Sequence, residues 1–135
     1  MKKAVVFIIV GVVVCLAIVG LLLKDKIMGK NDGQFKSITM DEAKEIFKTP
    51  GDYIILDVRR ADEYASGHIP GAINVANEDI STSQPAELPE LDKVIYVYCR
   101  SGRRSKMASS KLAAMGYTNI IEFGGIIDWT GETEK

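Results

Sequence analysis

The sequence predicts an α/β domain, a parallel sheet flanked by helices on both faces, preceded by one transmembrane helix. Two continuous apolar runs, residues 53–58 and 94–98, have the pattern of buried strands. Two stretches with apolar residues at helical spacing, 39–47 and 105–115, accompany them. Strands that alternate with helices are typical of parallel sheets. An uncharged apolar run at 4–23 precedes all of these elements.

The N-terminal run of 20 residues has the length of a membrane-spanning helix, because a helix of that length is about 30 Å long. A cleaved signal peptide would have a shorter apolar region that ends in a small-x-small site, which the sequence around Leu23 lacks. Lipid attachment at Cys15 would need a small residue directly before the cysteine, where Val14 stands. We therefore expect an uncleaved, single-pass anchor at residues 4–23.

Lysines flank both ends of this run and leave two orientations open. By count, Lys24, Lys26 and Lys30 favour a cytoplasmic globular domain. A three-residue N-terminal tail before an apolar run, however, is typical of a signal-anchor that keeps the N-terminus inside. We expect this second orientation, which makes the globular domain extracytoplasmic. The predicted organisation is an anchor with its flanks at 1–30, a polar tether at 31–36 and a globular domain at 37–131.

Charge and cysteine content exclude several classes of function. Residues 1–30 hold five lysines and one aspartate, a net charge of +4, and the other 12 basic and 17 acidic residues give 31–135 a net charge of −5. An acidic domain argues against nucleic-acid binding. Two cysteines, one of them in the apolar run, exclude a disulfide scaffold, and with a single histidine they argue against a structural zinc site. We expect no metal and no cofactor.

The elements of the globular part follow in order. Residues Thr39–Glu42 have the form of a capping box and start the first helix. After it the sequence predicts a strand at 53–58, an acidic stretch at 61–66, a turn at 67–71, a brief strand at 72–75 and a polar connection at 77–92. There follow a strand at 94–98, a loop at 99–104, a helix at 105–115 that ends at Gly116, and a last strand at 119–123.

Cys99 stands between a central strand and a helix, where open parallel sheets bind ligands. Backbone N–H groups in such a loop and the helix dipole favour a negative charge, and Arg100, Arg103 and Arg104 lie within five residues of the sulfur. We therefore predict a lowered pKa for the Cys99 thiol and a strong nucleophile. The alternative is an inert cysteine at the end of a core strand, but three arginines and a glycine do not suit a core position.

Three further residues are expected to support the site. No histidine or aspartate stands beside Cys99 in sequence, which gives a Cys–His protease arrangement little support. His68, the only histidine, precedes a Pro-Gly turn, and we expect it to hold that turn through a hydrogen bond. Asp57 and Arg59 close the first strand, where we expect an ion pair that orients the following loop.

The chain resembles the single-domain members of the rhodanese (thiosulfate sulfurtransferase) family in three segments. They are LDVRRADEYASGHIPGAINV (56–75), VYCRSGRRSKMASSKLAAMGY (97–117) and GGIIDW (124–129), and together they place the resemblance over about residues 36–130. The resemblance implies a five-stranded parallel sheet flanked by helices. It also implies a six-residue active loop, Cys99 to Arg104, whose amides cradle a persulfide on the cysteine.

The activity that the resemblance implies is sulfur transfer in two steps. The Cys99 thiolate attacks a small anionic donor such as thiosulfate and becomes a persulfide, and a thiol or cyanide then takes the outer sulfur. By analogy with the family, Arg100 and Arg104 are expected to attract the donor, with Arg103 a further candidate. The expected substrate-binding residues are Arg100, Ser101, Gly102, Arg103, Arg104 and Ser105.

Two other functions fit parts of this pattern. Phosphatases and arsenate reductases of related fold are one alternative, but phosphatases use a longer Cys-x-x-x-x-x-Arg loop, and the sixth residue after Cys99 is Ser105. The globular part also has no second cysteine to resolve an oxidised one, as arsenate reduction would need. A non-catalytic rhodanese-like binding or regulatory module is the other alternative, although the retained Cys99 favours an enzyme.

Overall fold

The computed structural model describes residues 34–135. The predicted anchor at 1–30, with its apolar run 4–23, and the first tether residues, 31–33, lie outside the described residues. In the part of the chain that the structure describes, every helix is too short or too polar to cross a membrane.

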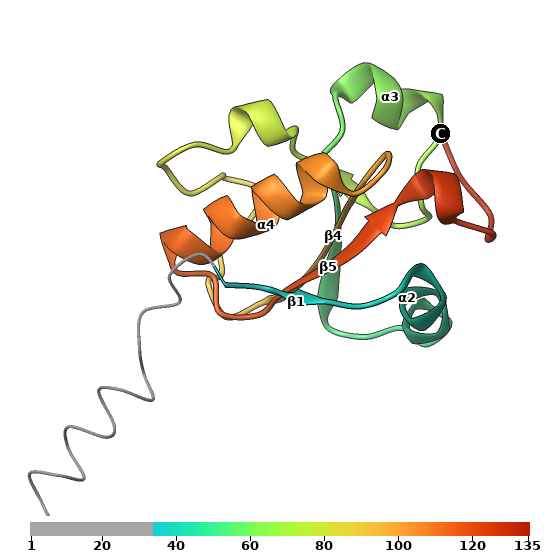
Figure 1. Ribbon diagram of the computed structural model, residues 1–135, viewed down its shortest axis with the longest axis horizontal. Coiled ribbons are helices and arrows are strands. Elements are labelled where there is room, and N and C mark those ends of the chain that lie inside the picture. The colour runs from blue at the N-terminus through green and yellow to red at the C-terminus, as the bar shows by residue number, and fades with distance from the viewer. Residues whose placement is uncertain (1–33) are drawn as a thin grey trace, which may run out of the picture. The chain divides into compact units, whose positions relative to one another are not determined.

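A five-stranded parallel sheet forms the centre of the domain, as the resemblance implies (Figure 1). Its strands stand in the order β1-β5-β4-β2-β3, and each neighbouring pair is parallel. The central strand β4, Val94–Cys99, pairs with β2, Tyr53–Asp57, on one side and with β5, Ile120–Gly125, on the other. The edge strands are β1, Lys36–Ser37, and β3, Ile73–Asn74.

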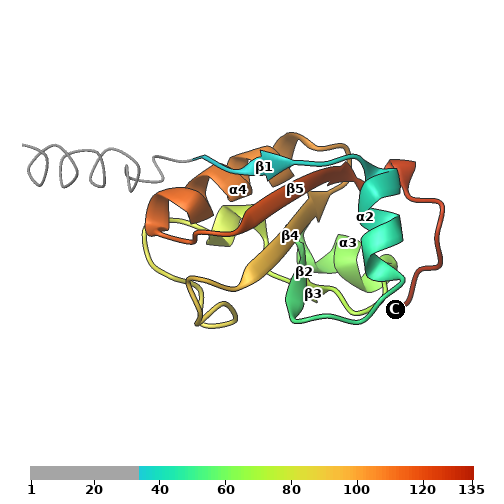
Figure 2. The same ribbon diagram turned by 90° about the horizontal axis from the view of Figure 1, so that it is seen from below.

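Helices cover both faces of this sheet, as predicted. The helices are α2, Met40–Phe47, α3, Ala61–Ser66, and α4, Arg103–Met115, and two short 3-10 turns are η1, Asn77–Asp79, and η2, Ile126–Asp128. α4 and α2 lie on opposite sides of the strands, and Figure 2 shows the same layers from below. The predicted capping box of α2 is present, since Thr39 Oγ1 accepts a hydrogen bond from Glu42 N at 3.1 Å and Thr39 N donates to the Glu42 carboxylate at 2.8 Å.

The side chains of β4 alternate between two buried clusters. Ile95, Val97 and Cys99 pack in the cluster beneath α4, whereas Tyr96 and Tyr98 pack in the cluster beneath α2. Because both faces are covered, the strand needs apolar residues at every position, and this is why its sequence shows no alternation. Cys99 is thus placed on the α4 side of the sheet.

The start of helix α4 and the edge strand β1 are among the places where the structure differs from the predicted elements. Helix α4 begins at Arg103, two residues before the predicted start, because Gly102 has a left-handed φ of 103° that turns the chain into the helix. Strand β1 includes Lys36, the last residue of the predicted tether, and Phe35 packs against the α4-side cluster. A two-residue edge strand is too short to show a periodic pattern in the sequence.

The ordered structure also extends past the predicted end at residue 131. Glu134 forms an antiparallel bridge with His68 through two backbone hydrogen bonds of 2.9 Å. Its Oε1 accepts a hydrogen bond of 2.8 Å from Gly71 N. His68 Nδ1 lies 2.9 Å from the carbonyl O of Tyr64, on whose ring it stacks. His68 therefore ties the turn to α3, in agreement with the expected hydrogen bond.

A buried ion pair fixes the loop after β2. Arg59 Nη2 donates to Asp57 Oδ2 at 2.8 Å, and its Nε lies 3.1 Å from both carboxylate oxygens. Asp57 is 0% exposed and Arg59 is 6% exposed. Arg59 Nη2 also donates to Gly67 O at 2.7 Å, so the pair connects the end of β2 to the end of α3. This is the ion pair that the sequence predicts.

Replacing Arg59 with methionine is expected to lower the free energy of unfolding by about 3–5 kcal/mol, because the Asp57 carboxylate then stays buried without its cation. Urea unfolding at neutral pH measures the loss. The matched control is Arg60→Met, because the Arg60 side chain is 64% exposed and its replacement is expected to cost about 0.5 kcal/mol or less. Equal losses in the two variants would contradict the prediction.

Candidate active site

Strand β4 carries Cys99 to the carboxyl end of the sheet. Cys99 is the last residue of β4 and pairs with Gly125 of β5 after a shift in register. The chain then turns through residues 100–102 into α4. Cys99 is 1% exposed, so the surrounding residues shield it from bulk water. The cysteine therefore lies where the sequence predicts, at the edge at which parallel sheets bind ligands.

Hydrogen-bond donors surround the sulfur of Cys99. Gly102 N donates to Sγ at 3.0 Å, and Ser105 Oγ lies 3.5 Å from Sγ. Burial of the sulfur raises its pKa, but hydrogen bonds from the Ser105 hydroxyl and from the backbone N–H groups of Ser105, Gly102 and Ser101 outweigh burial and hold the pKa of the thiol below its ordinary value. The predicted lowering thus comes from hydrogen bonds more than from the neighbouring arginines.

Two glycines allow the loop to take this shape. Gly102 has a φ of 103°, which side chains of L-residues rarely adopt. Gly125 has an extended backbone, but a Cβ there would lie 2.0 Å from the carbonyl O of Arg100. Ile127 N donates to the same carbonyl at 3.2 Å. The backbone of β5 therefore packs directly against the backbone of the loop.

The three arginines of the loop have different surroundings. Arg100 and Arg103 are exposed. Arg104 forms a bidentate ion pair with Glu63 of α3, with N–O distances of 2.7 and 3.0 Å. The hydrogen bond from Arg104 lowers the pKa of Glu63 to about 2, and the same bond raises the pKa of Arg104. Arg104 is thus held in one position, whereas the other two side chains face solvent.

We did not predict the partner of Arg104 from the sequence. Glu63 lies 41 residues earlier in the chain, and its signal was its place in the acidic stretch 61–66, shortly after strand β2. β2 and β4 are neighbouring parallel strands, so their carboxyl ends meet at one edge of the sheet. The acidic stretch is therefore brought beside the arginine-rich loop.

A buried carboxylate on β5 also lies beside the loop. Glu122 is 3% exposed, and its Oε1 accepts hydrogen bonds from Ser105 Oγ at 2.6 Å and from Gly124 N at 2.8 Å. Its Oε2 lies 3.4 Å from Ser37 Oγ. We did not predict this residue either, although a charged side chain inside the apolar strand Ile120–Gly125 was a signal.

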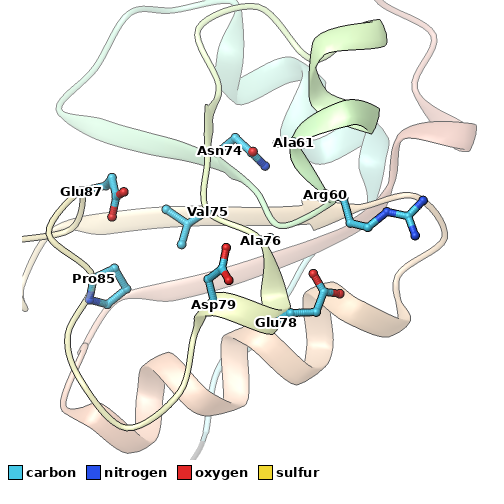
Figure 3. Close-up of a pocket in the computed structure, with 9 residues that line it drawn as sticks. All are labelled: Arg60, Ala61, Asn74, Val75, Ala76, Glu78, Asp79, Pro85 and Glu87. Atoms are coloured by element: carbon cyan, nitrogen blue, oxygen red, sulfur yellow. The ribbon is translucent and has the colours of Figure 1, made fainter.

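Two cavities lie around this end of the sheet. The cavity of Figure 3, of about 360 Å³, lies between the start of α3 and η1. Its charged lining residues are Arg60, Glu78, Asp79 and Glu87. With three carboxylates to one guanidinium, this lining does not suit an anionic sulfur donor. The other cavity, of about 340 Å³, is lined in part by Ser101, Gly102 and Glu122.

Comparison with known proteins identifies the family of the chain. A model of the rhodanese-like domain family matches residues 39–132. The chain belongs to the rhodanese-like domain family. Among its relatives, thiosulfate sulfurtransferase PspE of Escherichia coli is 34% identical over 73 residues, which cover 54% of this chain and 70% of PspE. YtwF of Bacillus subtilis is 34% identical over 103 residues, which cover 75% of this chain and 96% of YtwF.

Not every relative has the same length. The chain spans 56% of the length of YrkF of Bacillus subtilis, to which it is 35% identical over 106 residues. The names of these three relatives describe a sulfur carrier protein, YrkF, and two sulfurtransferases, PspE and YtwF.

Solved structures have the same fold. A rhodanese-like domain protein from Staphylococcus aureus is 32% identical, with a TM-score of 0.63, and the match covers 74% of this chain and 97% of that one. A rhodanese with anions from Escherichia coli is 31% identical, with a TM-score of 0.56, over 62% of this chain and 98% of that one.

Gly125→Ala tests whether the loop needs the close approach of β5. The added methyl group would meet the Arg100 carbonyl, so the loop has to move, and we expect a stability loss of about 1–3 kcal/mol. We also expect the pH midpoint of Cys99 alkylation by iodoacetamide to move upward, toward the value of about 8.5 of a free cysteine. Urea unfolding and alkylation rates over pH measure the two effects.

The control for this variant is Gly51→Ala, at the amino end of the sheet. A Cβ at Gly51 would meet the side chain of Tyr53, 2.8 Å away, and no part of the loop. This control should leave the alkylation midpoint unchanged. If the midpoint of Gly125→Ala also stays unchanged, the close approach of β5 does not shape the surroundings of the sulfur.

Proposed function

We propose that the protein moves sulfane sulfur from a thiosulfate-like donor to a thiophilic acceptor through a persulfide on Cys99. The observation that carries the proposal is the set of hydrogen bonds that converge on a buried sulfur, with the 3.0 Å bond from Gly102 N at its centre. Such donors favour a negative charge on sulfur, and a persulfide anion needs the same donors as a thiolate.

The reaction proceeds in two balanced steps. In the first, the Cys99 thiolate attacks the outer sulfur of thiosulfate, the S–S bond of thiosulfate breaks, and sulfite leaves with the bonding electron pair. Cys99 then carries the outer sulfur as a persulfide anion. In the second, cyanide or the thiolate of an acceptor attacks that outer sulfur, and the Cys99 thiolate is the leaving group.

The charge on the enzyme stays the same through this cycle. The thiolate and the persulfide each carry one negative charge, so N–H groups that are already aimed at the sulfur have little need to reorganise between the steps. Shielding of Cys99 from water strengthens these interactions, because the local dielectric constant is lower than that of water.

The arginines have separate roles in this proposal. Arg100 and Arg103 are exposed and attract the dianionic donor from solution. Arg104 is held by Glu63 and supplies a positive charge at a fixed position beside the loop.

Incubation of the 135-residue chain with thiosulfate is expected to add one sulfur atom to Cys99, because the thiolate is stabilised and the donor is attracted by the arginines. Intact mass under non-reducing conditions measures the adduct. Cyanide should then remove the extra sulfur as thiocyanate. The rate of adduct formation should fall as the salt concentration rises, because salt screens the attraction between exposed charges.

The matched control is Cys99→Ser, which should gain no sulfur and yield no thiocyanate. An unsubstituted chain that gains no sulfur, while iodoacetamide still alkylates its Cys99, would favour the non-catalytic binding module.

We further propose that residues 4–23 anchor the chain in a membrane, with the globular part on the extracytoplasmic side. The support is the uncharged run of 20 residues, with Lys2 and Lys3 directly before it. After expression in a bacterial host, the chain should sediment with membranes, and protease added to spheroplasts should digest the globular part. Recovery of the chain in the soluble fraction contradicts the anchor, and protection from the protease contradicts the orientation.

A further inference from the structure

The hydroxyl of Ser105 connects the sulfur of Cys99 to the carboxylate of Glu122. Ser105 Oγ lies 3.5 Å from Sγ and 2.6 Å from Glu122 Oε1. Cys99 is 1% exposed, Ser105 is 0% exposed and Glu122 is 3% exposed. They come from β4, α4 and β5, which meet at the carboxyl end of the sheet.

Ser105 has one hydroxyl proton and several acceptors within reach of it. Its Oγ lies 2.6 Å from Glu122 Oε1, 2.9 Å from Gly102 O and 3.4 Å from Gly124 O, and 3.5 Å from the sulfur. The carboxylate and the sulfur are the two of these that can carry a negative charge. A distance of 2.6 Å is typical of a hydroxyl that donates to a carboxylate, so in the thiol state Ser105 donates to Glu122 and accepts from the S–H group of Cys99. In the thiolate state the sulfur has no proton and needs the hydroxyl proton instead. Each group has a donor of its own, Gly102 N for the sulfur and Gly124 N for the carboxylate. If Glu122 then remained ionised, two buried anions would still compete for the Ser105 proton, which is costly where water is excluded.

Nearby charges do not remove this competition. The charged side chains around the set are Arg100, Arg103 and Arg104 of the loop and α4, Lys106 of α4, Asp128 of η2 and Glu63 of α3. Within residues 34–135, none of these side chains has a hydrogen bond to Ser105 or to Sγ, and Arg104 is paired with Glu63. The protons of the thiol and of the hydroxyl are therefore shared among Cys99, Ser105 and Glu122 alone, within the described residues.

We propose that Glu122 takes up the proton of the Cys99 thiol, through Ser105, when the thiolate forms. The S–H proton moves to Ser105 Oγ while the hydroxyl proton of Ser105 moves to Glu122 Oε1. No electrons are exchanged, and the site keeps one negative charge. In the product, the neutral carboxyl of Glu122 donates to Ser105, and Ser105 donates to the sulfur.

Glu122 is thus a positioning residue, which acts on the sulfur through Ser105. The inference deepens the proposed function and rests on it for its biological meaning, because the Cys99 thiolate is the nucleophile of the first step and the leaving group of the second. With Glu122 protonated, Ser105 donates to Sγ whenever the thiolate is present.

The pH dependence of Cys99 alkylation by iodoacetamide tests the shared proton. Two groups that share a proton titrate in two coupled steps, so the rate for the unsubstituted chain should show two inflections. Glu122→Gln should lose the upper inflection and keep one that lies about one pH unit or more below it. The reason is that glutamine cannot take up a proton, while its amide can still donate to Ser105 as a neutral carboxyl does.

The matched control is Asp128→Asn, which removes an exposed carboxylate that lines the same cavity as Glu122. This variant should keep both inflections. A single inflection in the unsubstituted chain, or two inflections in Glu122→Gln, would overturn the proposal.

A second measurement does not depend on the folding of Glu122→Gln. At a pH between the two inflections, the infrared spectrum of the chain minus that of Cys99→Ser should contain the C=O stretch of one protonated carboxyl group. Absence of this band would overturn the proposal. Neither measurement uses a sulfur donor, so a failure of proton uptake is distinguishable from a failure of sulfur transfer.

Discussion

An anion on a buried sulfur needs hydrogen-bond donors that the fold holds in place, and this need shapes the carboxyl end of the sheet. Cys99 is almost fully buried, so water contributes little to stabilising its charge. The N–H group of Gly102 and the hydroxyl of Ser105 take the place of water. For these donors to converge on one atom, the chain has to turn within the three residues between β4 and α4. That turn is the feature on which the proposed chemistry depends.

Neighbouring residues that have no part in the chemistry hold this turn. Gly125 lets the backbone of β5 approach the Arg100 carbonyl, a contact that any side chain would prevent. Glu63 holds Arg104, and the Asp57–Arg59 pair fixes the start of the segment that carries Glu63. The donors around the sulfur are therefore positioned by contacts from β2, α3 and β5, and only in part by the loop itself.

The sequence predicted the central strands and the place of Cys99 because these depend on local patterns. β2 and β4 are covered on both faces, and a continuous apolar run is what such burial requires. Strand β1 was missed because two residues at an edge have no pattern of their own and are defined by their pairing with β5. The Glu63–Arg104 and Ser105–Glu122 contacts join residues 41 and 17 positions apart, so only the fold decides which groups meet.

The contacts of Glu134 bear on where the domain can be cut. The family match ends at residue 132, yet Glu134 forms hydrogen bonds with the backbone of His68 and with the N–H group of Gly71. A chain that ends at residue 132 would lose these hydrogen bonds. The backbone groups of His68 and Gly71 would then be hydrated, and the segment that follows α3 would no longer be held. α3 also carries Glu63, which holds the guanidinium of Arg104. Removal of the last few residues would therefore weaken the hold on Arg104, although the two places are about thirty residues apart in the chain.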